Sequence, residues 1–258
     1  MSALEVLFVL VAGVGAGAIN AAVGTGTLIT FPVLLAIGYP PVVANVSNSI
    51  GLVPGAVAGA LGYRAELVGQ RRRVLRLAVA SISGGIVGAA ALLLLPASAF
   101  DAVVPVFVGL AVVLVAFQPR ISAWVTRRRE ARARQDEAAD ADGGLGARIA
   151  TFACGIYGGY FGAAQGVMFL ATVGAVLPDD LQRINALKNV LVGMVNGVAG
   201  LVFVFAADVA WLPTAIIAVG ATVGGFLGAR FGRRLRPELL RGIIIVVGVV
   251  TVVRLALA

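Results

Sequence analysis

The sequence lacks histidine, and it contains one cysteine, one lysine and few charged residues of either sign. Histidine is the commonest metal ligand and the usual general base at neutral pH. A single cysteine, Cys154, cannot form an internal disulfide or a thiolate metal cluster. Together these absences argue against a metal site, a bound cofactor and a catalytic nucleophile–base pair.

Hydrophobic residues dominate the chain instead. They make up 60% of the 258 residues, and only 12% are charged, whereas a soluble domain would be about 25% charged. The mean hydropathy is +1.02, and the apolar runs 77–95, 209–229 and 242–258 are long enough to cross the ~30 Å hydrocarbon layer of a membrane. The sequence therefore predicts an all-α polytopic membrane protein with about 8–10 membrane segments.

Almost all of the positive charge is arginine, since lysine supplies only one of the 20 cationic residues. The arginines gather between the apolar runs, which is the orientation signal of a membrane protein rather than a nucleic-acid-binding surface. We therefore expect a lipid bilayer, and no nucleic acid, among the partners. The single lysine, Lys188, differs because it lies inside an apolar segment that starts near Leu181.

Residues 119–147 interrupt the apolar character with a run of arginines, followed by acidic residues and two glycines. The sequence predicts a charged linker there, between an N-terminal membrane repeat over 1–118 and a C-terminal repeat over 148–258. The positive-inside rule places such an arginine-rich linker in the cytoplasm.

The two halves match without gaps at one fixed offset. The matching positions are Gly15 and Gly155, Gly26 and Gly166, Asn45 and Asn185, and the stretches Gly84–Ala89 and Gly224–Ala229. Charge reverses between the halves, because the basic loop precedes the Gly-Gly helix in the first half and follows it in the second. We therefore expect two inverted-topology repeats, with the substrate site at their interface near the membrane midplane.

The segment 24–37 is too short to span a membrane at about 1.5 Å per residue, so we expect a half-helix or re-entrant piece. It is separated from its neighbour at Gly24-Thr25-Gly26, which Thr27 follows, and the second half repeats this break at Gln165-Gly166. Backbone N–H groups at a helix start, together with hydroxyls, can bind an anion. The alternative is that these small residues only permit close helix packing.

Polar side chains interrupt the apolar segment that follows each break. They are, in the first half, Asn45, Asn48 and Ser49 and, at the same offset in the second half, Asn185, Lys188 and Asn189. Polar groups in a membrane segment usually face the bundle interior, so we interpret these six as substrate contacts, with Lys188 as a fixed positive charge. The alternatives are hydrogen bonds between helices alone and, for Lys188, snorkelling to the nearby membrane surface.

The second half contains two recognisable stretches, Gly155–Ala163 and Asn185–Asn189. With Gly24–Pro32 and Pro40-Pro41 in the first half, they resemble the TauE/SafE sulfite-exporter family. The resemblance covers nearly the whole chain. It implies a bacterial inner-membrane permease that moves sulfite, sulfonates or related organosulfur anions, usually outward. Residues 164–166 depart from the family pattern, in which a more glycine-rich stretch is expected.

No carboxylate is central in any apolar segment, so we expect no side-chain proton relay. We hypothesise an inner-membrane permease that exports a small anion by alternating access. The sequence leaves open whether the protein is a monomer or an oligomer. Two alternatives stay open, a membrane scaffold or assembly subunit without transport and a membrane-embedded enzyme. The expected substrate contacts are Thr25, Gly26, Thr27, Asn45, Asn48, Ser49, Gln165, Gly166, Asn185, Lys188 and Asn189.

Overall fold

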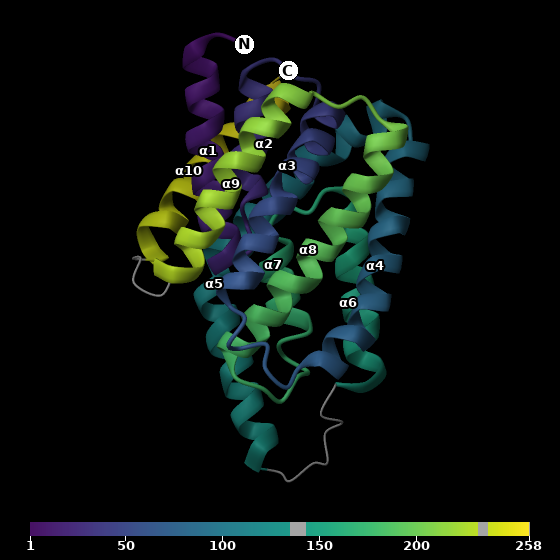
Figure 1. The fold of residues 1–258 in the computed structure, drawn as a ribbon, viewed down its shortest axis with the longest axis vertical. Coiled ribbons are helices and arrows are strands. Elements are labelled where there is room, and N and C mark those ends of the chain that lie inside the picture. Colours follow the sequence, from purple (N-terminus) through teal and green to yellow (C-terminus); the bar gives the residue numbers. More distant parts are fainter. Residues whose placement is uncertain (135–142, 232–236, 258) are drawn as a thin grey trace.

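The computed structural model describes residues 1–134, 143–231 and 237–257, and these ranges contain helices and no strand. The first half holds α1 (Ala3–Ala22), α2 (Thr27–Ala36), α3 (Pro41–Gly62), α4 (Arg71–Leu94) and α5 (Ala97–Arg134). The second half holds α6 (Gly144–Tyr160), α7 (Gln165–Thr172), α8 (Leu181–Ala206), α9 (Trp211–Phe231) and α10 (Pro237–Leu257). Figure 1 shows them as one bundle.

Six of these helices are long and apolar enough to cross a membrane, namely α1, α3, α4, α5, α8 and α9. Helix α2 and the part of α10 over Ile244–Leu255 are apolar but shorter. The prediction of an all-α membrane protein is therefore confirmed, and so is the short helix expected within 24–37. The helix start expected near Leu181 is also confirmed, because Asp180 caps α8 there by accepting a hydrogen bond from the Gln182 backbone N–H.

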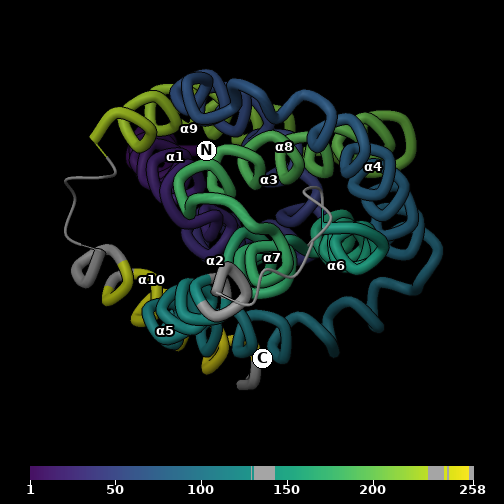
Figure 2. Tube along the Cα trace, turned by 90° about the horizontal axis from the view of Figure 1, so that it is seen from below, coloured from purple at the N-terminus to yellow at the C-terminus, as the bar shows by residue number. Residues whose placement is uncertain are grey.

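The helices of the two halves pack in the same pattern when the two halves are exchanged. Helix α1 packs on α9 as its counterpart α6 packs on α4, while α3 contacts α9 as α8 contacts α4. Helices α3 and α8 pack on each other, and so do α5 and α10. Figure 2 shows the α1–α9 pair and the α4–α6 pair on opposite sides of the bundle. This is the packing expected of two repeats that share one interior.

Helices α1 and α6 run in opposite directions through the molecule. In Figure 1, α1 descends from the N-terminus at the top, whereas α6 ascends from the lower end of the bundle. Both chain termini lie at the upper end. The orientation of the two repeats across a membrane stays a prediction.

The gap-free offset between the halves is correct for part of the chain only. The starts of α3 and α8 are related by the same offset as Asn45 and Asn185, and so are the starts of α4 and α9 and of α5 and α10. The ends of α1 and α6, however, lie two positions closer in sequence than this offset requires, and so do the starts of α2 and α7. The difference arises because α7 with the connection after it is two residues longer than α2 with its own connection.

The predicted pairings of Gly15 with Gly155 and of Gly26 with Gly166 are therefore wrong by two positions. The structural counterpart of Gly155 is Gly17, since each faces a backbone carbonyl of its partner helix, α4 for Gly155 and α9 for Gly17. A Cβ atom at either position would collide with that carbonyl. In a chain this rich in glycine, a shift of two positions still aligns glycine with glycine.

The linker predicted over 119–147 differs from what the structure shows. Helix α5 continues through Pro119 and the arginine run to Arg134, because arginine is a good helix former and a helix need not end where its apolar run ends. Residues 135–142 lie outside the described part of the chain. The division into 1–118, 119–147 and 148–258 stays a prediction.

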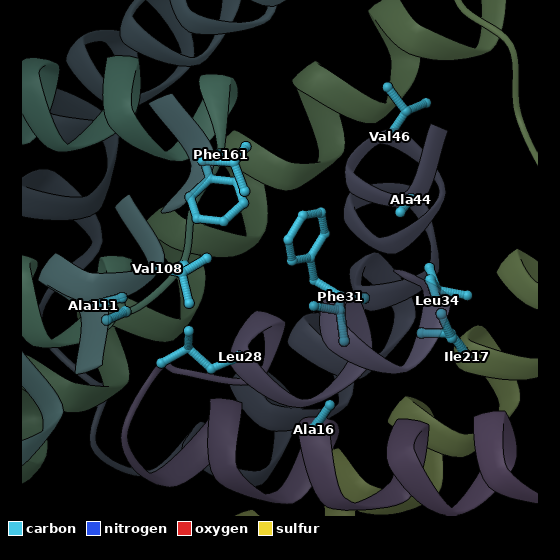
Figure 3. Packing of buried hydrophobic residues seen from close by; sticks show 14 of the residues in the cluster. Ala16, Leu28, Phe31, Leu34, Ala44, Val46, Val108, Ala111, Phe161 and Ile217 are labelled. Carbon is cyan, nitrogen blue, oxygen red and sulfur yellow. The ribbon is translucent and has the colours of Figure 1, made fainter. Parts of the chain in front are cut away.

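The main hydrophobic core lies beside the two helix breaks. Phe31 of α2 meets Phe161, which directly follows α6, edge to face with ring centroids 5.2 Å apart. Figure 3 shows this pair with Leu28 of α2, Val108 of α5 and Ile217 of α9, which belong to the same cluster. The core thus fixes the position of one break against the other.

Candidate binding site at two crossing helix breaks

Each half contains a helix that stops inside the bundle and resumes after a short break. Between α1 and α2 the chain turns at Gly24, whose φ is 84°. Between α6 and α7 it turns at Gly162, with φ 76°, and at Ala164, with φ 55°. Positive φ is easily reached by glycine and is strained for alanine. The second break is therefore the more strained of the two.

The two breaks touch each other through bare backbone. The Gly166 N–H donates to the carbonyl oxygen of Gly24 at 3.0 Å. A Cβ atom on either glycine would collide with the other residue. Glycine is required at both positions because no side chain fits between the two main chains.

Lys188 lies directly beside this crossing. Its side chain is 0% exposed, and a Cβ atom on Gly166 would lie 3.0 Å from the Lys188 Cδ. The Lys188 Nζ donates to the backbone carbonyl of Asn20 at 3.3 Å, in the last turn of α1. The snorkelling alternative is therefore wrong, since the amine points into the protein.

A protonated Lys188 would have no full counter-charge. Among the residues that the structure describes, no carboxylate pairs with Lys188. The carbonyl end of α1 offers only the partial negative charge of a helix C-terminus, about half an elementary charge. A buried cation that is not fully compensated carries a large desolvation cost.

Two asparagines flank Lys188 on the same helix and hold the same end of α1. Asn185 and Asn189 both donate through Nδ2 to the carbonyl oxygen of Ala21, at 3.3 and 3.0 Å. Their amide N–H groups are thus engaged by backbone. The Asn185 Oδ1 is buried and has no hydrogen-bond partner among the described residues.

The first half arranges its polar residues differently. Asn48 donates to the Thr27 hydroxyl at 3.2 Å and accepts a short hydrogen bond from the Thr30 hydroxyl. Asn45 donates to the carbonyl of Tyr160 at 2.9 Å, and Ser49 is buried on the same helix. The Asn48 side chain is therefore satisfied by two hydroxyls of α2.

The remaining predicted contacts lie at the starts of α2 and α7. The Gln165 Nε2 donates to the Cys154 carbonyl at 3.0 Å, in space left by the missing side chain of Gly158. The Gln165 Oε1 and the Thr25 hydroxyl are buried without a partner in the described chain. Gly26 packs closely on α1, where a Cβ atom would lie 2.5 Å from the Ala16 carbonyl oxygen. For Gly26 the structure thus shows close packing.

A cavity of about 190 Å³ reaches the site from one end of the bundle. Asn185 lines it, together with Tyr63, Gln118, Ser122 and Gln182. Lys188 follows Asn185 by three residues, which places both side chains on one face of α8. The cavity therefore approaches the lysine from the end of the bundle where α8 begins.

A charged cluster ties the two halves together at that same end. Asp179 accepts a short hydrogen bond from Arg73 of α4 and one from the Arg183 Nε at 2.8 Å. Arg183 also donates to the Val68 carbonyl at 3.1 Å, and Gln70 donates to the Arg183 carbonyl at 3.0 Å. The connection before α4 is thereby fastened to the start of α8.

The pKa of Asp179 is lowered from its ordinary value of 3.8. Partial burial alone would raise this pKa, but the hydrogen bonds from Arg73 and from the Asp180 backbone N–H, with the charges of Arg73 and Arg183, outweigh it. The carboxylate is therefore ionised at neutral pH.

The sequence did not predict this cluster. Asp179 and Arg183 are four residues apart at a helix start, a spacing that favours an ion pair between them. Arg73 lies 106 residues from Asp179, and no local pattern links residues at that distance. Among the described residues, no three acidic or cysteine side chains gather closely enough to hold a metal ion.

Comparison with known proteins gives one family. The profile described as "Sulfite exporter TauE/SafE" matches residues 9–255. "Probable membrane transporter protein YfcA" of Escherichia coli (strain K12) is 25% identical over 241 residues, covering 91% of this chain and 83% of the relative. "Probable membrane transporter protein ORF9" of Sinorhizobium sp is 22% identical over 256 residues, covering 96% of this chain and 91% of the relative. Among solved structures, none matches the chain. These names indicate membrane transporters rather than enzymes.

Proposed function

Because the chain belongs to the TauE/SafE sulfite exporter family of membrane transporters, we propose that it exports a small oxyanion bearing one negative charge, such as hydrogensulfite or an organosulfonate. The site is the crossing of the two helix breaks, and the anion lies against Lys188. The partners are this anion and the lipid bilayer of the plasma membrane, with the segment between α5 and α6 in the cytoplasm.

One observation carries the proposal, the fully buried Lys188 without a carboxylate partner among the described residues. An ammonium group in a membrane bundle is costly unless something neutralises it. Lys188 donates one hydrogen bond, to the Asn20 carbonyl, and an ammonium has three N–H groups. Two donors with a full positive charge therefore remain for an anion.

The charge balance of the site favours a monoanion. The buried charged residues of the described chain are Lys188 and Arg73, and Arg73 is paired with Asp179. One fixed positive charge neutralises one negative charge, whereas a dianion such as sulfate would leave a net buried charge. A sulfonate and hydrogensulfite each carry one charge and several acceptor oxygens.

The other expected contacts take different roles in this proposal. Asn185 and Asn189 position the end of α1, because their amide N–H groups bind the Ala21 carbonyl. The Thr25 hydroxyl, buried without a partner in the described chain, is free to donate to the anion. The crossing glycines allow the two broken helices to approach closely enough to share one ligand.

In this proposal the anion enters through the cavity that Asn185 lines. It opens at the end of the bundle where α8 begins, the basic end that holds Arg73 and Arg183. The positive-inside rule places this end in the cytoplasm. Movement of the two repeats against each other would then open the other end, as in transporters built from inverted repeats. An inside-negative potential favours exit of an anion by about 2.3 kcal/mol per charge per 100 mV, so export fits this geometry.

Replacing Lys188 by methionine tests the proposal. Lys188→Met keeps the length of the side chain and removes its charge. In proteoliposomes loaded with sulfite or a sulfonate, we expect efflux to fall roughly 10- to 100-fold, the value of a hydrogen bond to a charged group. The anion-dependent rise in thermal stability of the purified protein should disappear as well.

Gly197→Ala is the matched control, because Gly197 lies on α8 with nothing within 4 Å of the added Cβ atom. It should retain both efflux and the anion-dependent stabilisation. Unchanged efflux and unchanged stabilisation in Lys188→Met would exclude Lys188 as the anion-binding charge. Equal stabilisation of the wild-type protein by sulfate and by a sulfonate would contradict the preference for a monoanion.

A further inference from the structure

A groove of about 480 Å³ runs along the outer seam between α4 and α6, and its lining includes no residue of the helix crossing. Arg76 and Arg148 line one end of it, each in the second turn of its helix. Val79, Ile149 and Phe152 continue the lining into the apolar part of the seam. The groove therefore combines two guanidinium groups with an apolar channel.

The apolar part of the groove faces the surroundings of the bundle. Val79 and Ile149 are 71% and 60% exposed, and Phe152 is 37% exposed. Deeper in the seam the helices close on each other, because Gly84 and Gly88 of α4 lie against the α6 backbone. In a membrane, such exposed apolar side chains contact lipid chains.

The equivalent seam between α1 and α9 shows that the fold does not require these arginines. Gly224 and Gly228 lie against the α1 backbone there, as Gly84 and Gly88 lie against α6. When α4 is aligned with α9 by their starts and α6 with α1 by their ends, Arg76 corresponds to Ile216 and Arg148 to Leu10. The positive charge is thus a property of one seam only, at the basic end of the molecule.

We propose that the α4–α6 groove binds an anionic phospholipid of the cytoplasmic leaflet. Arg76 and Arg148 hold the phosphate, since guanidinium groups match phosphate oxygens in bidentate geometry. One acyl chain lies along Val79, Ile149 and Phe152. Basic pockets between membrane helices on the cytoplasmic side are suited to anionic headgroups for this reason.

Lipid titration of the purified, delipidated protein tests the proposal, with binding measured by native mass spectrometry. The probes are phosphatidylglycerol and phosphatidylcholine with identical acyl chains. We expect phosphatidylglycerol to bind more tightly, and the double variant R76Q/R148Q to weaken its binding about 30-fold, from roughly fivefold for each arginine. Each single variant should show the roughly fivefold loss alone.

The double variant R71Q/R72Q is the matched control. It removes the same charge from the same end of α4, and both residues are exposed but do not line the groove. We expect its affinity for phosphatidylglycerol to change by less than about twofold, because these charges act only at a distance. The thermal stability of each variant shows that it is folded.

Three results would overturn the proposal. The first is wild-type affinity in R76Q/R148Q, and the second is an equal loss in R76Q/R148Q and R71Q/R72Q, which would indicate a diffuse charge effect. The third is competition by glycerol phosphate, which has no acyl chains, because the ligand would then be a soluble phosphate rather than a lipid.

Discussion

Asn48 in α3 and Lys188 in α8 hold equivalent positions, each seven residues after the start of its helix. The Asn48 side chain forms its hydrogen bonds within its own half, with the hydroxyls of Thr27 and Thr30. Lys188 reaches into the other half and donates to the Asn20 carbonyl of α1. Equivalent positions in the two halves thus hold a neutral amide bonded within its own half and a lysine without a carboxylate partner in the described chain.

The two ends of the bundle differ in the same way. At one end Arg73, Asp179 and Arg183 form the charged cluster that joins the halves. The equivalent positions at the other end hold Pro213, Tyr39 and Val43, and Tyr39 packs on the main hydrophobic core. One end is therefore closed by ion pairs and the other by apolar contact, so pH should act on them unequally.

The largest effect is expected from placing a second charge at the neutral position. Asn48→Lys would bury another cation and leave Thr27 and Thr30 without their partner. We expect a loss of about 3–5 kcal/mol in the free energy of unfolding, the range for an uncompensated buried charge. Denaturation of the protein in detergent, followed by tryptophan fluorescence, measures this loss.

The double variant Asn48→Lys/Lys188→Asn separates charge from position. It again contains one buried lysine, now in the first half, and should recover part of the lost stability. If Asn48→Lys alone were as stable as the wild-type protein, the first-half position would accept a charge as readily as the second. The comparison between the two halves would then fail.

The next effect concerns the glycines of the two breaks. Gly24→Ala adds the cost of left-handed backbone, about 1–2 kcal/mol, to an overpacking cost of about 1–3 kcal/mol, because its Cβ atom would collide with Gly166. Gly162→Ala adds the same backbone cost, but its Cβ atom meets the Gly158 carbonyl oxygen only at 3.0 Å. The difference between the two variants isolates the contact between the breaks, and thermal unfolding measures it. Equal losses would mean that the crossing contributes nothing.

Much of this arrangement can be predicted from the sequence, and the reasons for the exceptions are physical. Hydrophobic run length predicts the membrane helices, and the polar residues within a run predict the buried face of α8, including Lys188. A gap-free alignment cannot detect the shift of two positions at the breaks, because α7 is shorter than α2 and its connection is longer. Hydropathy does not locate the end of α5, which continues as a polar helix.

Contacts between the halves could not be predicted from local patterns. The pairing of Arg73 with Asp179 and the hydrogen bond from Lys188 to Asn20 join residues that are far apart in the sequence. The first depends on how α4 packs on α8 and the second on how α1 meets α8, which the repeat pattern indicates only approximately. The sequence therefore predicts which residues are unusual, and the packing determines which of them meet.

A smaller effect is expected at the charged end. Asp179→Asn removes the charge that both arginines bind, and we expect a loss of about 1–2 kcal/mol in the free energy of unfolding. The pKa of Asp179 is lower in the folded protein than its ordinary 3.8. Its contribution is therefore fully present above that value and is lost as the pH falls through the folded pKa. Unfolding measured over acidic pH should show this loss in the wild-type protein and not in Asp179→Asn.

Tyr39→Phe provides the control for the apolar end, since Tyr39 is the counterpart of Asp179. Its stability should depend on pH as that of the wild-type protein does, because no charge is removed. A pH dependence that survives in Asp179→Asn would assign the effect to another carboxylate.

The smallest effect compares the asparagines Asn45 and Asn185, which are true counterparts because each lies four residues after the start of its helix. Each donates to a backbone carbonyl near the end of the opposite half's first helix, Tyr160 for Asn45 and Ala21 for Asn185. The Ala21 carbonyl keeps a second bond, from Asn189. We expect Asn45→Ala to cost about 1 kcal/mol of unfolding free energy and Asn185→Ala less than that.

Transport should rank the same two variants in the opposite order. Asn185 lines the cavity near the start of α8, about one helical turn from Lys188, whereas Asn45 lies on α3, where the position equivalent to Lys188 is the neutral Asn48. We therefore expect anion efflux in proteoliposomes to fall more in Asn185→Ala than in Asn45→Ala, although Asn185→Ala is the more stable protein. If efflux simply followed stability, both asparagines would act only as helix contacts. An inverted ranking would mean that the asymmetry of charge between the halves extends to the path that the anion takes.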